Sequence, residues 1–198
     1  MKLFGTTTSP YVRKVRIALE EKAIPYELVP ARASDPNAGV SELNPLGKVP
    51  VLVRDDGGTL YDSSVIIEYA DGLTDTARLI PNDFAGRIEV KRWEALGDGV
   101  ADATVAMTHI EGQKPEWYAN QRKKIDRALQ TMERDIGARQ FCHGDAFSLA
   151  DIAAGFAIGY LDYVLPVVDW RKSCPGLTAL CERLASRNSF RTTAPPPR

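Results

Sequence analysis

The chain of 198 residues lacks several features that particular protein classes require. Its formal charge is −1, from 25 Lys and Arg against 26 Asp and Glu, so it has no basic excess for binding a phosphate backbone. It has 2 histidines and 3 cysteines, with no Cys-x-x-Cys pair and no zinc-ligand spacing. We therefore expect no nucleic acid partner, no metal site and no disulfide framework.

Long hydrophobic runs are also missing. The longest uncharged apolar stretch, 152–161, is far shorter than the roughly 18 residues of a membrane span. The first apolar residues give way to Gly5 and Thr6, too early for a secretory signal core. With 44% apolar and 26% charged residues, the composition is typical of a soluble globular protein, which we expect in the cytoplasm without a membrane partner.

The first eighty residues alternate strand-like and helix-like segments, which indicates an α/β unit. Strands are expected at 2–4 and 26–29, separated by a helix that begins at Pro10. The turn signal at 55–58 joins two short runs that we interpret as a hairpin, with a further helix after it. Periodicity then fades, so we place a domain boundary near residue 80.

The remainder of the chain carries helical patterns. Apolar residues recur at spacings of three and four between Trp93 and Ile110, and again over 118–136, which predicts two long helices paired as a hairpin. Ser148 and Asp151 have the spacing of a capping box before an apolar helix. The predicted domains are 1–80, an α/β domain, and 85–198, an all-helical domain.

Two features of the first long helix have alternative interpretations. Trp93 and Met107 are interpreted as core residues, with the lining of a hydrophobic pocket as the alternative. Gly97 and Gly99 each cost the helix roughly 1 kcal/mol relative to alanine. They indicate either close packing or open space beside the helix.

Ser9 stands where the helix at Pro10 is expected to begin. A serine at this position caps the helix, whose positive end also attracts an anion. Ser9 therefore either caps the helix only or also donates a hydrogen bond to a bound thiolate. Lowering a thiol pKa by two units needs roughly 2.7 kcal/mol, which one charged hydrogen bond of about 1.5–3 kcal/mol and the helix end can supply.

The segment 44–52 combines a turn with a proline at the start of a short strand. The Val49–Pro50 bond is either an ordinary trans bond or a cis bond that turns the Val49 amide and carbonyl outward. In the second case these groups can pair with an extended peptide ligand. Lys48 is either a solvated loop residue or the partner of a ligand carboxylate.

Asp62 and Ser63 open the helix after the hairpin. The pair either caps that helix only or forms a ligand site. As a ligand site, Asp62 binds an ammonium group, while the Ser63 hydroxyl and amide bind a carboxylate at the same helix end. An amino acid head group carries both charges, so the sequence points to a small zwitterionic peptide.

Four motifs together resemble those of the cytosolic-type glutathione S-transferases, in the order typical of that family and over almost the full chain. The motifs are Ser9-Pro10-Tyr11-Val12-Arg13-Lys14-Val15-Arg16, the segment from Asn44-Pro45 to Val49-Pro50, the segment from Asp62-Ser63 to Ile66, and Ser148-Leu149-Ala150-Asp151. Within the family the chain is similar to the serine-type, YibF-like bacterial proteins. The resemblance implies an α+β two-domain fold, with a thioredoxin-like α/β domain followed by an all-α helical domain, and it implies a homodimer.

The resemblance also implies roles for single residues. Ser9 would face the glutathione sulfur, and Val49, before a cis proline, would pair its backbone with the cysteinyl part. Asp62 and Ser63 would hold the γ-glutamyl end. Lys48 lies near enough in the sequence to meet the second carboxylate.

Other residues near these motifs leave alternatives open. The hydroxyls of Thr6, Thr7, Thr8 and Tyr11 compete with Ser9 as the thiolate contact, and the loop 32–39 is expected to add ligand contacts that cannot be assigned to single residues. No cysteine stands near Ser9, which argues against the thiol-disulfide exchange branch of the family. Ser148 and Asp151 match the structural capping box of the family.

We therefore expect a glutathione transferase of the kind used in detoxification. It would stabilise the glutathione thiolate and conjugate it to a small hydrophobic electrophile, in a pocket to which the helical domain contributes. Glutathione would be a cosubstrate, with no permanently bound cofactor. The alternatives are a glutathione-binding stress or interaction protein with little transferase activity, and a glutathione-dependent isomerase.

Overall fold

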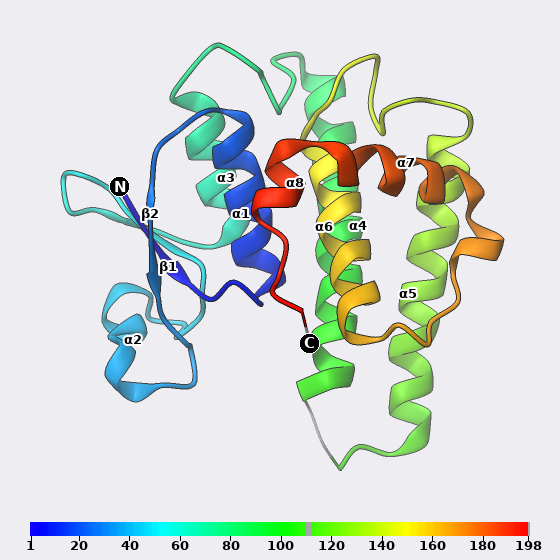
Figure 1. Ribbon diagram of the computed structural model, residues 1–198, viewed down its shortest axis with the longest axis horizontal. Helices are drawn as coiled ribbons and strands as arrows, with labels where there is room; N and C mark the ends of the chain where they lie inside the picture. Colours follow the sequence, from blue (N-terminus) through cyan, green and yellow to red (C-terminus); the bar gives the residue numbers. More distant parts are fainter. Residues whose placement is uncertain (110–111, 198) are drawn as a thin grey trace. The chain divides into compact units, whose positions relative to one another are not determined.

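The computed structural model describes residues 1–109 and 112–197, and it contains two compact units (Figure 1). The first unit consists of Met1–Leu79 together with Asn188–Arg198, and the second consists of Ile80–Arg187. The predicted helical domain, 85–198, extends to the end of the chain, whereas the last residues group with the first unit. Ile110, predicted as the end of an apolar stripe, lies outside the described residues.

A four-stranded mixed sheet forms the centre of the first unit, in the order β2-β1-β3-β4. β1 (Lys2–Gly5) pairs in parallel with β2 (Glu27–Pro30) and antiparallel with β3 (Val51–Val53). β4 (Thr59–Leu60) pairs antiparallel with β3 and forms the other edge. Because β2 is an edge strand, its terminal Pro30 removes no ladder hydrogen bond from the sheet centre.

Two α-helices connect these strands, and a third follows the last strand. α1 (Pro10–Glu21) links the two parallel strands, the short α2 (Val40–Leu43) precedes β3, and α3 (Ser63–Gly72) follows β4. α1 and α3 pack against each other, with apolar side chains spaced to fall on one face of each helix. The fully buried residues of this core include Leu3, Val12, Val15, Ile17, Leu52, Ile66 and Ile67.

The last helix, α8 (Asn188–Thr192), is held by α1. Its Ser189 hydroxyl donates to the Glu21 carboxylate at 2.5 Å. Arg13 of α1 donates to the Phe190 carbonyl at 3.3 Å, and Arg16 donates to the Thr192 carbonyl at 3.2 Å. These contacts explain why the end of the chain belongs to the first unit although it follows the second in sequence.

The second unit is helical throughout its regular structure in the described range. Its long elements are α4 (Phe84–His109), α5 (Pro115–Ile136), α6 (Leu149–Val164) and α7 (Pro175–Ser186). α6 has an almost continuous run of buried residues and packs against both α4 and α7. A helix that is apolar on all sides is expected at the centre of its unit.

The two glycines of α4 have different surroundings. A Cβ on Gly97 would come within 2.5 Å of the Ala153 carbonyl oxygen, so this glycine permits the close approach of α4 to α6. Gly99 has nothing within 4 Å of such a Cβ. Of the two interpretations of this pair, close packing therefore applies to Gly97 and open space applies to Gly99. Trp93 is fully buried, as a core residue should be, and Met107 is partly buried.

The predicted capping box at α6 is present. The Asp151 carboxylate accepts hydrogen bonds from the Ser148 amide at 2.9 Å, the Ser148 hydroxyl at 3.2 Å and the Cys142 amide at 2.8 Å. The Ser148 hydroxyl accepts from the Ala150 amide at 3.3 Å. Asp151 is completely buried, so its role is to satisfy backbone donors inside the second unit.

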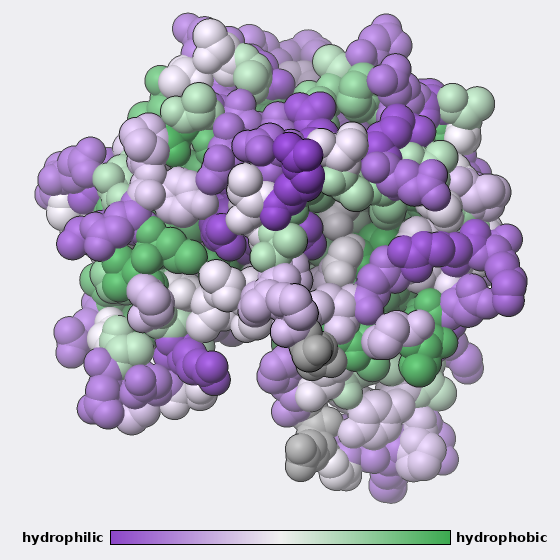
Figure 2. All heavy atoms as spheres, viewed as in Figure 1, coloured by the Kyte–Doolittle hydropathy of each residue, from purple (hydrophilic) through white to green (hydrophobic). Residues whose placement is uncertain are grey.

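The face of the molecule shown in Figure 2 is mostly hydrophilic, with apolar residues gathered in smaller areas between polar ones. Among residues 1–109 and 112–197, no helix combines the length and hydropathy that crossing a bilayer requires.

Candidate functional site

Ser9 is the N-cap of α1, as predicted. Its hydroxyl oxygen accepts a hydrogen bond from the Val12 amide at 3.4 Å, and Pro10 occupies the first turn. That first turn contains no acidic residue, so no negative side chain of the turn neutralises the partial positive charge at the helix N-terminus. In the described part of the chain the Ser9 hydroxyl hydrogen has no acceptor, which leaves it available to a bound anion.

The competing hydroxyls differ from Ser9 in their surroundings. The hydroxyls of Thr6 and Thr8 bond to each other at 3.3 Å, and Thr7 is exposed. Tyr11 is partly buried and has interactions of its own. Ser9 is the hydroxyl that stands at the helix start itself, which favours it as the anion contact.

The loop before β3 is held by Asn44, a buried residue to which the sequence analysis gave no role. Its side-chain amide donates to the Lys48 carbonyl at 2.8 Å, and its side-chain oxygen accepts from the Leu46 amide at 3.0 Å. The Val49–Pro50 bond is cis, the second of the two predicted alternatives. The Val49 amide and carbonyl form no hydrogen bond within residues 1–109 and 112–197, and the Lys48 side chain is exposed.

Asp62 is the N-cap of α3. Its Oδ1 accepts hydrogen bonds from the Ser64 amide at 3.1 Å and the Ser64 hydroxyl at 2.5 Å. Ser63, the first residue of the helix, is buried, and its amide and hydroxyl have no partner in the described range. The Tyr61–Asp62 bond is also cis. The helix start therefore offers an acid and a free amide side by side.

Asp62 is ionised more easily than an ordinary aspartate. Burial raises the pKa of its carboxyl, but hydrogen bonds from Ser64 and Val65 and the charge of Lys14 outweigh that effect, so the pKa is lowered. Asp62 thus keeps its negative charge over a wide pH range. An exposed carboxylate with this charge is suited to a ligand ammonium group.

The sheet register brings these segments to one end of the sheet. Val51 pairs with Phe4, so Pro50 lies beside the end of β1, from which the chain continues to Ser9. Leu52 pairs with Leu60, so Asp62 follows β4 at the same end. The partly buried side chains of Phe4, Val49 and Tyr61 pack against one apolar cluster, which supports this placement.

The loop 32–39 adjoins the same cluster. Its short helix η1 (Pro36–Ala38) is capped by Asp35, which accepts from the Asn37 amide at 2.9 Å. Ala38 packs against the cluster to which Val49 and Tyr61 belong, while residues 32–37 are exposed. The loop thus lies near the candidate site, and its predicted ligand contacts stay a prediction.

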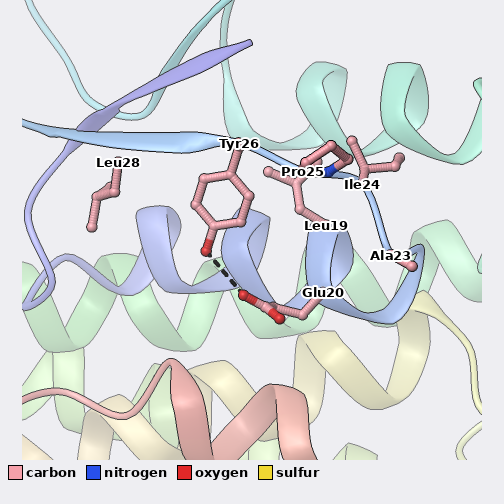
Figure 3. A pocket seen from close by; sticks show the side chains of 7 residues that line it. All are labelled: Leu19, Glu20, Ala23, Ile24, Pro25, Tyr26 and Leu28. Atoms are coloured by element: carbon pink, nitrogen blue, oxygen red, sulfur yellow. Dashed lines mark hydrogen bonds between the residues drawn. The ribbon is translucent and has the colours of Figure 1, made fainter.

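A separate hollow lies at the other end of α1 (Figure 3). Tyr26 points across it toward Glu20, and its hydroxyl accepts from Arg16 at 3.2 Å and donates to Glu20 at 3.4 Å. Burial raises the pKa of Tyr26. None of the predicted site residues lines this hollow; its lining residues are Leu19, Glu20, Ala23, Ile24, Pro25, Tyr26 and Leu28.

Comparisons with known proteins identify the family. Residues 3–78 match the model of the glutathione S-transferase N-terminal domain, and residues 115–183 match that of the C-terminal domain. The GST-like protein YibF of Escherichia coli strain K12 is 37% identical over 99% of both chains. The chain belongs to the glutathione S-transferase family. The family and the two-domain fold predicted from the motifs are confirmed.

Solved structures of this family agree closely with the fold. A glutathione S-transferase from Methylobacillus flagellatus KT with glutathione bound has a TM-score of 0.94 and 44% identity, covering 98% of this chain and 99% of its own. A glutathione S-transferase from Methylobacterium radiotolerans in complex with glutathione sulfonate has a TM-score of 0.93 and 40% identity, covering 100% and 95%.

Three residues of this family member were missed by the sequence analysis. Asn44 closes the loop before Val49, Ser64 holds the Asp62 carboxylate, and Lys14 contributes charge to Asp62 from α1. A serine two residues after an N-cap acid is a detectable signal, because such a hydroxyl can reach the acid within one turn. The contribution of Lys14 depends on the packing of α1 against α3, which no local pattern specifies.

Proposed function

We propose that this protein binds glutathione, stabilises its thiolate and conjugates it to a small hydrophobic electrophile. The observation that carries the proposal is the placement of three segments at one end of the sheet: the helix start at Ser9, the unpaired backbone of Val49, and the acid and amide at Asp62 and Ser63. Structures of relatives with glutathione or glutathione sulfonate bound support the same ligand.

Each segment suits one part of glutathione. The Ser9 hydroxyl donates to the sulfur, and the Val49 amide and carbonyl pair with the cysteinyl backbone like an added strand. Asp62 binds the γ-glutamyl ammonium, while the Ser63 amide and hydroxyl bind its carboxylate at the positive end of α3. Lys48 meets the glycyl carboxylate.

The chemistry follows from the thiolate. The glutathione thiol loses its proton to solvent, and the hydrogen bond from Ser9 with the α1 helix end favours the resulting anion. The sulfur then donates its electron pair to an electrophilic carbon, so an S–C bond forms. The displaced group leaves with the electron pair of its own bond, or, in an addition, the adduct takes a proton from water. Ser9 keeps its proton throughout.

Further parts of the proposal concern the rest of the molecule. The helical domain contributes the electrophile pocket, the protein acts as a homodimer, and glutathione is the only cosubstrate besides the electrophile. The cytoplasmic location expected from the sequence also stays a prediction.

Calorimetric titration with glutathione, followed by a conjugation assay over a panel of hydrophobic electrophiles, tests the function. We expect saturable binding and the formation of thioether conjugates. Binding without any conjugate would instead select the glutathione-binding stress or interaction protein. Rearranged product with glutathione regenerated would select the isomerase, and absence of binding would contradict all three.

A further inference from the structure

Asn44, the C-cap of α2, is buried with an exposed fraction of 2%, and both polar groups of its side chain are hydrogen-bonded. Its side-chain amide donates to the Lys48 carbonyl at 2.8 Å, and its side-chain oxygen accepts from the Leu46 amide at 3.0 Å. Its backbone amide donates to the Val40 carbonyl at 2.8 Å, and its backbone carbonyl accepts from the Gly47 amide at 2.8 Å. Asn44 thus ties the loop before β3 to the end of α2.

The Lys48 carbonyl belongs to the same peptide group as the Val49 amide. A peptide group is planar, and in the trans form its C=O and N–H bonds point in opposite directions. The Lys48–Val49 bond is trans. The hydrogen bond from Asn44 to the carbonyl therefore fixes the direction of the Val49 N–H, which points away from Asn44. Val49 is partly exposed, and its N–H has no acceptor in the described part of the chain, so it is open to a ligand.

The same hydrogen bond makes the Val49 amide a better donor in two ways. A hydrogen bond accepted by a carbonyl polarises its peptide group, so the N–H of that group donates more strongly. A donor whose direction is fixed before the ligand arrives also loses less conformational entropy on binding. Because Asn44 is buried, water does not compete for its bond to Lys48.

We propose that Asn44 is a positioning residue of the glutathione site: by holding the Lys48 carbonyl it directs the Val49 N–H at the cysteinyl carbonyl of the ligand. This inference rests on the proposed function. A chain of hydrogen-bonded groups then runs from the Leu46 amide through the Asn44 side chain and the Lys48–Val49 peptide to the ligand. Asn44 acts through Val49, since the loop itself binds both polar groups of its side chain.

Asn44→Asp keeps the oxygen that accepts from Leu46, but its ionised carboxylate cannot donate to the Lys48 carbonyl. We expect the dissociation constant of S-methylglutathione, which lacks the thiol, to rise about three- to tenfold, the range of one neutral hydrogen bond. In turnover assays the KM for glutathione should rise while kcat at saturating glutathione changes less than about twofold, because this backbone contact is equal in the ground and transition states. Asn120→Asp, at an exposed position of α5, is the matched control and should leave both quantities unchanged.

A ligand analogue tests whether Asn44 acts through the Val49 N–H rather than through the charge that the variant adds. In this analogue sulfur replaces the cysteinyl carbonyl oxygen of S-methylglutathione, and a thioamide sulfur is a weaker hydrogen-bond acceptor than oxygen. The wild type should bind the analogue about three- to tenfold more weakly than S-methylglutathione, whereas Asn44→Asp should bind the two ligands within about twofold of each other. An equal preference in both proteins, or a wild-type dissociation constant in a variant that is merely less stable in urea, overturns the proposal.

If Asn44→Asp does not fold, NMR of the wild-type protein decides the question. A scalar coupling across the hydrogen bond, between Asn44 Nδ2 and the Lys48 carbonyl carbon, should be present in the free protein and in the complex with S-methylglutathione. The Val49 amide proton should move downfield on binding. Absence of the coupling in either state, or an unmoved Val49 amide proton, overturns the proposal. If the wild type does not bind S-methylglutathione, the proposed function fails and this inference with it, whereas binding without any effect of Asn44 contradicts this inference alone.

Discussion

Two helix starts in this molecule use the same residue types in opposite environments. α3 in the first unit begins at the exposed Asp62, and α6 in the second unit begins beside the fully buried Asp151. Hydrogen bonds and the charge of Lys14 lower the pKa of Asp62 despite partial burial, whereas burial raises the pKa of Asp151 despite hydrogen bonds from Cys142 and Ser148.

The difference shows how one local motif serves function in one place and stability in another. The carboxylate of Asp151 accepts three hydrogen bonds from donors of its own unit and is fully buried, so it is not accessible to a ligand. Asp62 is held on one side by Ser64 and is open to solvent, next to the unpaired amide of Ser63. Exposure and unused hydrogen-bonding capacity therefore distinguish a binding residue from a structural cap.

The largest expected effect is the loss of stability when the buried acid, Asp151, is replaced. Asp151→Ala leaves the Cys142 and Ser148 amides without an acceptor, so we expect the free energy of unfolding to fall by about 3 kcal/mol. Urea denaturation measures this change. The exposed Asp145 in the same loop is the matched control, and Asp145→Ala should change stability by less than about 0.5 kcal/mol. Equal effects of both variants would contradict a structural role for Asp151.

Ser9→Ala should act on activity more than on stability. Loss of one hydrogen bond to the thiolate, about 1.4–2.7 kcal/mol, should lower turnover about ten- to a hundredfold. Conjugation rates at saturating glutathione, together with the ultraviolet absorbance of the bound thiolate as a function of pH, measure it. Unchanged rates would transfer the role to another hydroxyl, with Thr7 or Tyr11 as the next candidates.

Asp62→Asn should weaken ligand binding while it preserves the helix. We expect the dissociation constant of glutathione to rise about tenfold, the equivalent of about 1.4 kcal/mol for one charged hydrogen bond. Thermal unfolding should change little, because asparagine still caps α3. Calorimetry on this variant and on the exposed Asp56→Asn control separates a specific site from the general loss of one negative charge.

Ser148→Ala tests whether the start of α6 serves stability alone, in contrast to the start of α3 at Asp62. Removing a buried N-cap hydroxyl should lower the free energy of unfolding by about 1 kcal/mol. Glutathione affinity of the folded protein should stay the same. A loss of affinity in Ser148→Ala comparable with that in Asp62→Asn would remove the distinction between the two helix starts.

The smallest effects concern the pH dependence of stability. The contributions of Asp62 and Asp151 to the free energy of unfolding should change with pH in opposite directions. Asp62 has a folded pKa below its ordinary 3.8, so its stabilising contribution is present above that value and is lost as the pH falls through the lowered one. Asp151 has a folded pKa above 3.8, so its contribution declines as the pH rises from that value toward the raised one. Urea denaturation of wild type, Asp62→Asn and Asp151→Asn across the acid range measures both slopes. Slopes of the same sign would show that the two environments are alike.

Local patterns were sufficient to predict most of the elements and both helix starts. Ser9 and Pro10, and the box at Ser148 and Asp151, each have a signature within a few residues, whereas the residues around Val49–Pro50 left the cis and trans forms open. The bounds of the strands expected at 2–4 and 26–29 differ by one residue from the observed Lys2–Gly5 and Glu27–Pro30, because pairing partners far along the chain decide where a ladder ends.

Features that depend on distant contacts could not be predicted in the same way. α8 returns to the first unit because Arg13 and Arg16 of α1 bond its carbonyls, and those pairs are separated by nearly the whole chain. The burial of Lys14 likewise follows from the packing of α1 on α3. The sheet order that brings Val49 and Asp62 to one end is also a property of the register rather than of either motif.

A crystal structure of the protein with glutathione tests the central claim most directly. We predict the sulfur within hydrogen-bond distance of the Ser9 hydroxyl, the cysteinyl backbone paired with Val49, and the γ-glutamyl ammonium and carboxylate on Asp62 and Ser63. Glutathione bound away from Val49 and from the start of α3 would contradict the account.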